Sequence, residues 1–156
     1  MNSYNFVDEN FFDNGKNYCV SNSSTKLDSY NATPHLGLNG KLIKGSACNV
    51  YFVWNGGYKC FVPNANTFNN LFKNWKTIIQ LHDDELNSIS TGPDISNNAC
   101  LITGNNNTYL LTNGEKHFIT APSVMEYCNF DWKKILKVPQ IIIDSIPNGK
   151  NIDYGI

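Results

Sequence analysis

The chain has 156 residues, a length that suits one domain or two small units with a common core. Its formal net charge is −1, and all 12 of its basic residues are lysine. Both features argue against a nucleic-acid partner, because phosphate binding needs positive charge and base recognition relies on the planar fork of arginine. No apolar run approaches the length of a membrane span, so we expect no transmembrane segment.

Residues 1–39 precede the regular part of the chain and are predicted to form a hairpin around Asn14 and Gly15, followed by a loop. The hairpin is either a degenerate third repeat or a cap. Residues 1–20 show no signal-peptide pattern.

A first unit is predicted at residues 40–95. Asn55, Gly56 and Gly57 supply the positive φ angles that a tight hairpin turn needs. We expect Asn64 or Asn66 to cap the helix and Asp83 to cap the last helical turn. The expected elements, in chain order, are a strand at 41–44, hairpin strands at 50–54 and 58–62, a helix within 64–72, a strand at 77–81 and a helical turn at 85–89.

A second unit at residues 96–156 repeats the first at a spacing of 57 residues. Lys59 recurs as Lys116, and Gly92 recurs as Gly149. Ser123 is the expected helix cap of this unit. A constant spacing over more than thirty residues indicates two copies of one supersecondary unit, and neither copy is large enough to bury a core alone.

The predicted fold is therefore α+β and mainly β. It consists of two pseudo-symmetric repeats of strand, β-hairpin, short helix, strand and terminal turn in one compact domain.

The residue pattern of the first unit also resembles that of a known repeat. The pattern comprises 42–45, 50–53, Asn55-Gly56, 61–63, Thr67-Phe68, Trp75, 83–89 and Gly92-Pro93. It resembles a tandem repeat of secreted bacterial proteins, in which several copies accompany the catalytic domains of cell-wall hydrolases and peptidases. The resemblance covers residues 40–152 and implies a non-catalytic accessory module. It supplies no ligand-binding residues.

The densest group of titratable side chains is His82-Asp83-Asp84-Glu85. A cation site and an acid/base pair are conceivable there, but a helix N-terminus is the favoured interpretation, since carboxylates are stabilised at that end. The second unit has Pro139-Gln140-Ile141-Ile142 instead. No nucleophile elbow, phosphate loop or zinc motif is present. We therefore expect no enzyme, no metal site and no cofactor.

Cysteine spacing gives a second indication against metal binding, because no pair is separated by two residues. The chain has five cysteines, an odd number, so at least one thiol stays free unless it pairs with a cysteine of another chain. Buried free thiols and at least one disulfide both remain open for Cys19, Cys48, Cys60, Cys100 and Cys128.

Two aromatic positions differ in how they recur. Trp75 recurs as Trp132, which favours core packing for both. Trp54 instead has Thr112 at the equivalent position, which is unusual for a core residue. With Tyr58 it flanks the first hairpin turn, where the pair either stacks on a sugar ring or only stabilises the hairpin.

We expect a ligand to bind at the hairpin tips, because the tips diverge between repeats while interior positions recur. The candidate ligand-binding residues are Trp54, Asn55, Tyr58, Asn113 and Lys116.

The expected function is a non-catalytic binding module for polysaccharide or for cell-surface or cell-wall material, located outside the cell or on its surface. A cytoplasmic location is the alternative. The alternative function is a self-assembling structural subunit of a coat, a fibre or a virion, which would make the chain a homo-oligomer.

Overall fold

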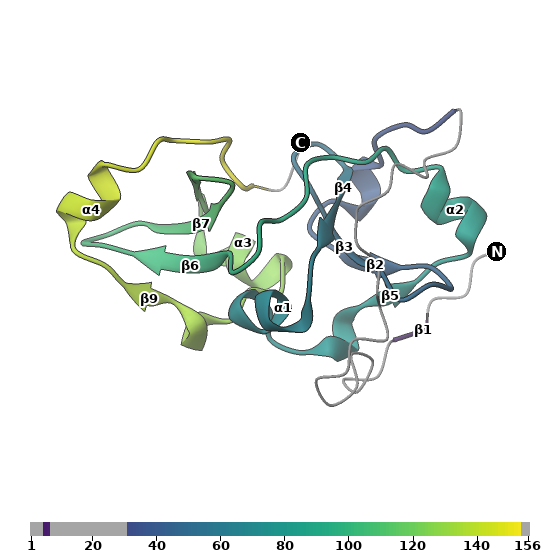
Figure 1. Cartoon of the computed structure of the whole chain (residues 1–156), viewed down its shortest axis with the longest axis horizontal. Helices are drawn as coiled ribbons and strands as arrows, with labels where there is room; N and C mark the ends of the chain where they lie inside the picture. Colours follow the sequence, from purple (N-terminus) through teal and green to yellow (C-terminus); the bar gives the residue numbers. More distant parts are fainter. Residues whose placement is uncertain (1–4, 7–30, 154–156) are drawn as a thin grey trace.

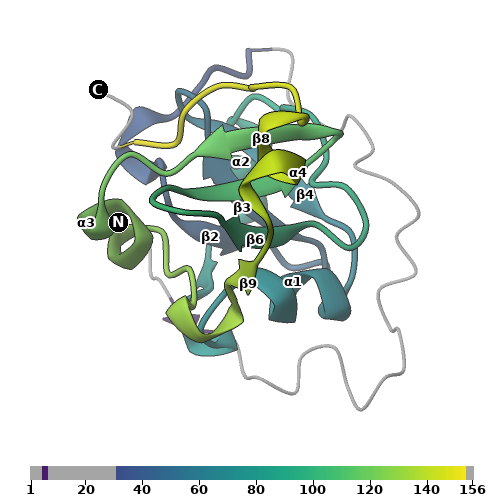
Figure 2. The ribbon, with the colours of Figure 1, turned by 90° about the vertical axis from the view of Figure 1, so that its left-hand side faces the viewer.

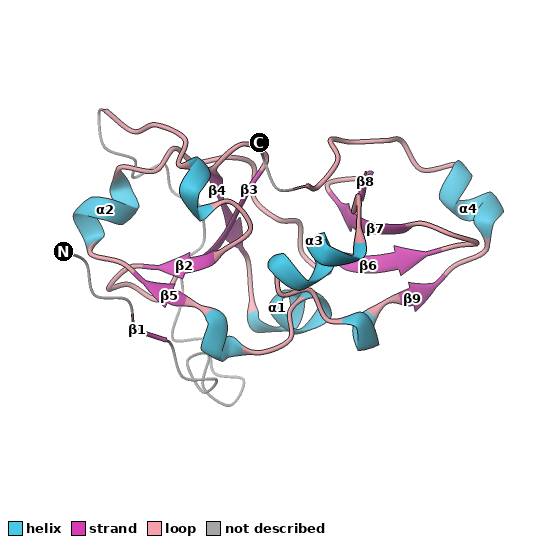
Figure 3. Ribbon diagram, turned by 180° about the vertical axis from the view of Figure 1, so that it is seen from behind, coloured by secondary structure: helices cyan, strands magenta, loops and turns pink. Residues whose placement is uncertain are grey.

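The structure is a computed structural model, and it describes residues 5–6 and 31–153 (Figure 1). Two β-sheets lie side by side along the long axis, with short helices between them (Figures 1 and 3). The hairpin predicted around Asn14 and Gly15 lies outside the described residues. None of the helices in the described ranges is long and apolar enough to cross a membrane.

The first repeat forms most of a five-stranded sheet with the strand order β1-β5-β2-β3-β4. A 3-10 turn precedes it at Leu36–Leu38, and another follows α1 at Trp75–Thr77. The remaining elements are β1 (Asn5–Phe6), β2 (Leu42–Lys44), β3 (Val50–Trp54), β4 (Tyr58–Val62), α1 (Ala65–Leu71), β5 (Ile79–Gln80) and α2 (Asp83–Asn87).

The second repeat forms a four-stranded sheet with the order β8-β7-β6-β9. In both sheets the hairpin is antiparallel, while the last strand of the repeat pairs in parallel with the first, β5 with β2 and β9 with β6. This confirms the predicted α+β, mainly β fold of two pseudo-symmetric repeats. The elements are β6 (Cys100–Thr103), β7 (Thr108–Thr112), β8 (Glu115–Phe118), α3 (Pro122–Tyr127), a 3-10 turn (Trp132–Lys134), β9 (Leu136–Lys137) and α4 (Gln140–Asp144).

Both hairpins close through an Asn-Gly turn in the left-handed region. Asn55 and Gly56 have φ angles of 59° and 89°, and Asn113 and Gly114 have 54° and 76°. In the second hairpin, where Thr112 pairs with Glu115, these angles suit the two-residue turn that matches the twist of paired strands, whereas the first hairpin, where Trp54 pairs with Tyr58, has a third loop residue. Gly57 follows with a φ of 95°, and a Cβ there would lie 2.6 Å from the His35 backbone, so only glycine fits.

One hydrophobic core joins the two repeats. Phe72 and Phe130 stack at its centre, with ring centroids 5.4 Å apart and planes 14° apart. The two residues also form an antiparallel bridge, flanked by a hydrogen bond from the Lys73 amide to the Asn129 carbonyl. The repeats therefore share a core and do not stand as separate units.

The predicted helix caps are correct in one case of three. Asn64 caps α1, and its side chain accepts a hydrogen bond from the Thr67 amide at 2.9 Å. Ser123 does not cap α3; Ala121 is the N-cap and Pro122 opens the helix. Proline has no amide hydrogen to satisfy at that position and presets the helical φ angle, which explains the shift.

Asp83 is not a cap either, because it is the first helical residue of α2. Its carboxylate accepts hydrogen bonds from the amide and the hydroxyl of Ser46 and so holds the β2–β3 turn. Gln140 does the same in the second repeat, where its side-chain oxygen accepts from the Asn105 amide. The structural role recurs although the residue type does not.

The tryptophans that recur between repeats are not equally buried. Trp75 stacks on Phe68 with ring centroids 3.9 Å apart, as a core residue should. Trp132 is 44% exposed, so the prediction of core packing was wrong for this residue. Met125 takes the place of Phe68 in the second repeat, and Trp132 instead donates its indole N–H to Glu126.

Candidate functional site

The two hairpin tips meet across the boundary between the repeats. The indole of Trp54 and the imidazole of His117 pack edge to face, with ring centroids 5.0 Å apart and planes at 83°. Trp54 also stacks on Phe52 and is only 7% exposed. The expectation that Trp54 is not a core residue was therefore wrong, because Phe52 and the second repeat cover its side chain, whereas the alternative of a hairpin-stabilising pair is compatible with this packing.

Trp54 lies directly opposite Tyr58 in the ladder between β3 and β4, so the cross-strand pair exists as an arrangement. Tyr58 is 36% exposed and lines neither cavity described below. The structure thus does not present the two rings as one open stacking platform.

Two adjoining cavities lie beside the first hairpin tip, and we call them together the tip cleft. Trp54, Asn55 and Lys150 line both cavities. The first, of about 240 Å³, is completed by Pro93, Ile95, Asn113, Glu115 and His117. The second, of about 310 Å³, is completed by Asn39, Gly40, Gly56, Cys128, Asn151, Ile152 and Asp153.

Two residues shared by the cavities carry a buried polar atom without a partner. The indole Nε1 of Trp54 and the amide Oδ1 of Asn55 form no hydrogen bond with any residue that the structure describes. Leaving a buried donor or acceptor unsatisfied costs on the order of 1–3 kcal/mol. An unpaired donor next to an unpaired acceptor is expected at a site where a ligand supplies the missing hydrogen bonds.

The other polar groups of the tip cleft are held in place by the fold. Asn39 accepts from the Gly57 amide at 3.1 Å, and Asn113 donates its side-chain amide to the Asp94 carbonyl at 2.9 Å. Nδ1 of His117 lies 2.8 Å from the Lys150 carbonyl oxygen. The cleft is therefore preorganised, which reduces the entropy that a ligand loses on binding.

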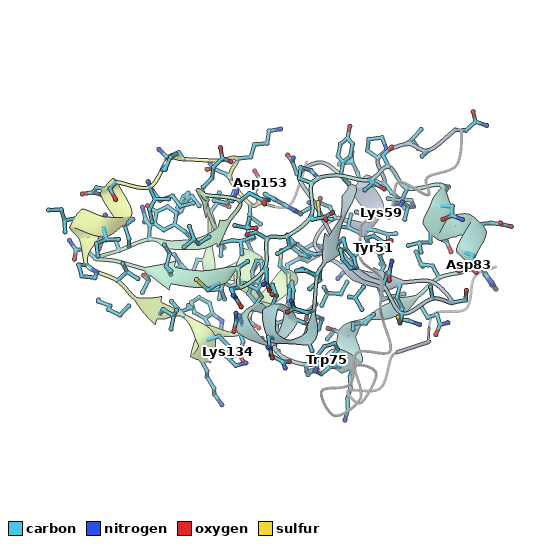
Figure 4. All side chains as sticks on the ribbon, viewed as in Figure 1. Tyr51, Lys59, Trp75, Asp83, Lys134 and Asp153 are labelled. Atoms are coloured by element: carbon cyan, nitrogen blue, oxygen red, sulfur yellow. The ribbon has the colours of Figure 1, made fainter. Side chains whose placement is uncertain are left out.

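The charges of the tip cleft are mixed. Lys150, Glu115 and Asp153 are all exposed, and Figure 4 shows Asp153 at the boundary between the two halves of the molecule. The thiol of Cys128 is not a nucleophile at neutral pH, because burial raises its pKa to about 12. The lining thus offers hydrogen bonds to an uncharged polar ligand.

Lys116 does not belong to the tip cleft. It is 7% exposed, and its Nζ donates to the carbonyl of Ile146. Lys59 at the equivalent position is also buried and donates to the carbonyl of Ile89. The position of Lys116 therefore indicates a structural role, and its recurrence as Lys59 was the signal for that role in the sequence.

Of the predicted site residues, Trp54, Asn55 and Asn113 are brought together, whereas Tyr58 and Lys116 are not. The sequence reasoning missed Lys150 and the residues that follow it. Gly149 recurs as Gly92, but Lys150 stands where the first repeat has Pro93. The two repeats therefore differ not only at the hairpin tips but also in the segment that follows Gly92 and Gly149.

No group of three or more metal-ligating side chains is found among the described residues. The Asp83 carboxylate accepts two hydrogen bonds from Ser46, and these lower the pKa of Asp83.

Cys48 is disulfide-bonded, whereas Cys60, Cys100 and Cys128 are free thiols. The chain therefore contains both a disulfide and free thiols, and Cys60 and Cys128 are the buried ones among the free thiols.

Comparison with known proteins gives no further guidance. No family model, no curated protein and no solved structure matches the chain.

Proposed function

We propose that the chain is a non-catalytic binding module that takes a hydroxyl-rich ligand, a polysaccharide or cell-surface glycan, in the tip cleft. The observation that carries the proposal is the unpaired pair of polar atoms, Trp54 Nε1 and Asn55 Oδ1. A sugar hydroxyl both donates and accepts a hydrogen bond, so a single hydroxyl or two neighbouring ones would satisfy both atoms.

The composition of the lining supports an uncharged polar ligand. Asparagine amides offer a donor and an acceptor each, and Asn39, Asn55, Asn113 and Asn151 all line the tip cleft. Charges of both signs are present beside them, so neither an anion nor a cation is favoured by the field of the site.

The cavity volumes indicate how much of a glycan would enter. Each cavity, at about 310 Å³ and about 240 Å³, lies near the lower limit of ordinary small-molecule sites, which begin at roughly 300 Å³. We therefore expect a chain end or a single sugar residue to be bound. Hydrogen bonds would dominate, since Phe52 and His117 cover the ring of Trp54.

The disulfide at Cys48 supports a location outside the cytoplasm. Disulfides persist in oxidising compartments and are rare in the cytosol. This agrees with a module that acts on the cell surface or in the extracellular space.

Self-association into a structural assembly is the second candidate. It is favoured by four large apolar side chains that are exposed in the second repeat, Trp132, Leu136, Ile141 and Ile142. Exposed apolar side chains of this size support an interaction surface when they lie together.

The experiment that tests the proposal is a glycan array with the full chain, followed by calorimetry on any hit. The double variant Asn55→Ala with Lys150→Ala should weaken binding at least tenfold. The matched control is Asn106→Ala with Lys133→Ala, which removes the same groups from exposed positions outside the tip cleft and should bind as the wild type does. Equal affinity of both double variants would reject the tip cleft. A concentration-dependent polymer without glycan binding would favour the second candidate.

A further inference from the structure

The outer edge of β9 differs from that of its counterpart in the first repeat. β5 carries β1 on its outer side, with Asn5 opposite Gln80 and Phe6 opposite Ile79. β9 lies 57 residues further along the chain and pairs with β6 in the same way. On its other side, however, no strand is present in the described part of the chain (Figure 2).

The backbone of β9 presents unpaired groups at this edge. The amide of Val138 donates to the carbonyl of Thr103 in β6 at 2.9 Å. Because neighbouring residues of a strand direct their backbone groups to opposite sides, the N–H and C=O of Lys137 face away from β6. Lys137 is the equivalent of Gln80, the residue that pairs with Asn5 in the first sheet.

The side chains around the edge are apolar and basic. Leu136 is 54% exposed, and Lys133 and Lys137 are exposed beside it. Lys134, which is labelled in Figure 4, is also exposed, and its Nζ donates to the carbonyl of Asn69. The equivalent run in the first repeat, residues 76–80, holds only one lysine, whereas residues 133–137 hold three.

These charges disfavour a second copy of β9 as the occupant. Two identical strands paired antiparallel would bring their lysines together, and like charges on adjacent strands are destabilising. The same lysines favour a segment that carries carboxylates. The chain holds an example of such a segment, because β1 is followed by Val7, Asp8 and Glu9.

We propose that the outer edge of β9 binds an extended acidic segment of a partner protein by strand addition, as β5 binds β1. The segment runs antiparallel to β9, places an apolar side chain opposite Leu136, as Phe6 stands opposite Ile79, and pairs its backbone with Lys137. Its carboxylates lie near Lys133 and Lys137. This site is separate from the tip cleft and does not depend on the glycan proposal.

The competing explanation is that the lysines only protect an open edge against pairing, which is a common use of lysine in edge strands. The two explanations differ in one outcome, because a protective edge binds no strand of either charge.

A synthetic peptide with the sequence of residues 1–13 is the probe, since it contains β1 and three carboxylates. It would be added to the full-length, ¹⁵N-labelled chain, and backbone amide shifts followed by NMR. We expect shifts centred on residues 135–138. A peptide with Asp8 and Glu9 replaced by lysine should bind at least tenfold more weakly to the same wild-type chain.

Lys137→Pro provides the test on the protein side. Proline removes the outward N–H without touching the pairing with β6, and it is tolerated at edge strands. The variant should lose peptide binding at least tenfold, whereas Asp84→Asn, an exposed change in α2 of the first repeat, should leave it unchanged. Any one of the following results would overturn the proposal: no shifts at millimolar peptide, shifts confined to residues 78–81, or equal affinity for both peptides. A dimer that forms without peptide and is lost in Lys137→Pro would overturn it in favour of a second copy.

Discussion

The indole of Trp54 in the first repeat and the imidazole of His117 in the second pack edge to face, with ring centroids 5.0 Å apart. This contact places the divergent tips of two similar hairpins against each other. Because Pro93 and Lys150 of the lining are different residues at equivalent positions, a pseudo-symmetric scaffold encloses an asymmetric cleft.

Trp54→Ala should strongly destabilise the protein. Truncation of a buried tryptophan typically costs about 3–5 kcal/mol, through lost burial and the cavity that remains. Tyr58→Ala removes an aromatic ring opposite Trp54 on the same hairpin, but at 36% exposure it should cost clearly less. Urea denaturation of both variants measures the difference, and equal losses would contradict the burial described for Trp54.

The tips also show which parts of the structure the sequence could predict. The 57-residue spacing predicted the topology because interior positions such as Lys59 and Lys116 recur where the fold imposes one environment. The exposure of Trp54 could not be read from its replacement by Thr112. Its ring packs against His117 as well as Phe52, and the contact with His117 is one between repeats that no local pattern encodes. Lys150 was missed for the same reason, since it reaches the tip cleft only through the packing of the last segment.

Lys116→Met should destabilise the protein by roughly 1–3 kcal/mol, because the half-buried carbonyl of Ile146 loses its donor. Lys133→Met is the matched control, since Lys133 is exposed. Such surface changes usually alter stability by less than about 0.5 kcal/mol. Thermal or chemical denaturation measures both, and a control that loses as much as Lys116→Met would show that burial of Lys116 contributes nothing specific.

Asp83 should make the free energy of unfolding depend on pH in acid. Hydrogen bonds from the hydroxyl and amide of Ser46 lower the pKa of its carboxyl in the folded state. Its contribution is therefore present above the unfolded pKa and is lost as pH falls through the lowered folded value. Asp83→Asn should destabilise the protein at pH 7 and have little further effect at pH 2.

The control for this pH dependence is Asp84→Asn, which removes a charge from the adjacent residue of α2. Urea denaturation at several pH values should show that the free energy of unfolding falls less between pH 7 and pH 2 for Asp83→Asn than for the control. The same pH dependence of the free energy of unfolding in both variants would show that the Ser46 contact does not stabilise the Asp83 carboxylate.

Cys128 should resist alkylation in the native protein. With a pKa of about 12, only about one thiol in ten thousand is ionised at pH 8, and the thiolate is the reactive form. Iodoacetamide labelling followed by peptide mass spectrometry should show slow modification of Cys128, and fast modification once the chain is unfolded in guanidinium. Rapid labelling of the native chain would mean that this wall of the tip cleft opens to solvent.

The most direct test of the tip cleft uses the indole N–H signals of the chain's three tryptophans in a ¹⁵N-resolved NMR titration with a glycan identified on the array. Single Trp→Phe variants assign the three signals. We expect the Trp54 signal to shift until the protein is saturated with the glycan, because its N–H gains a partner. Trp75 lies in the core and Trp132 already donates to Glu126, so their signals should stay in place. A glycan that binds while the Trp54 signal remains unchanged would show that the ligand does not bind in the tip cleft.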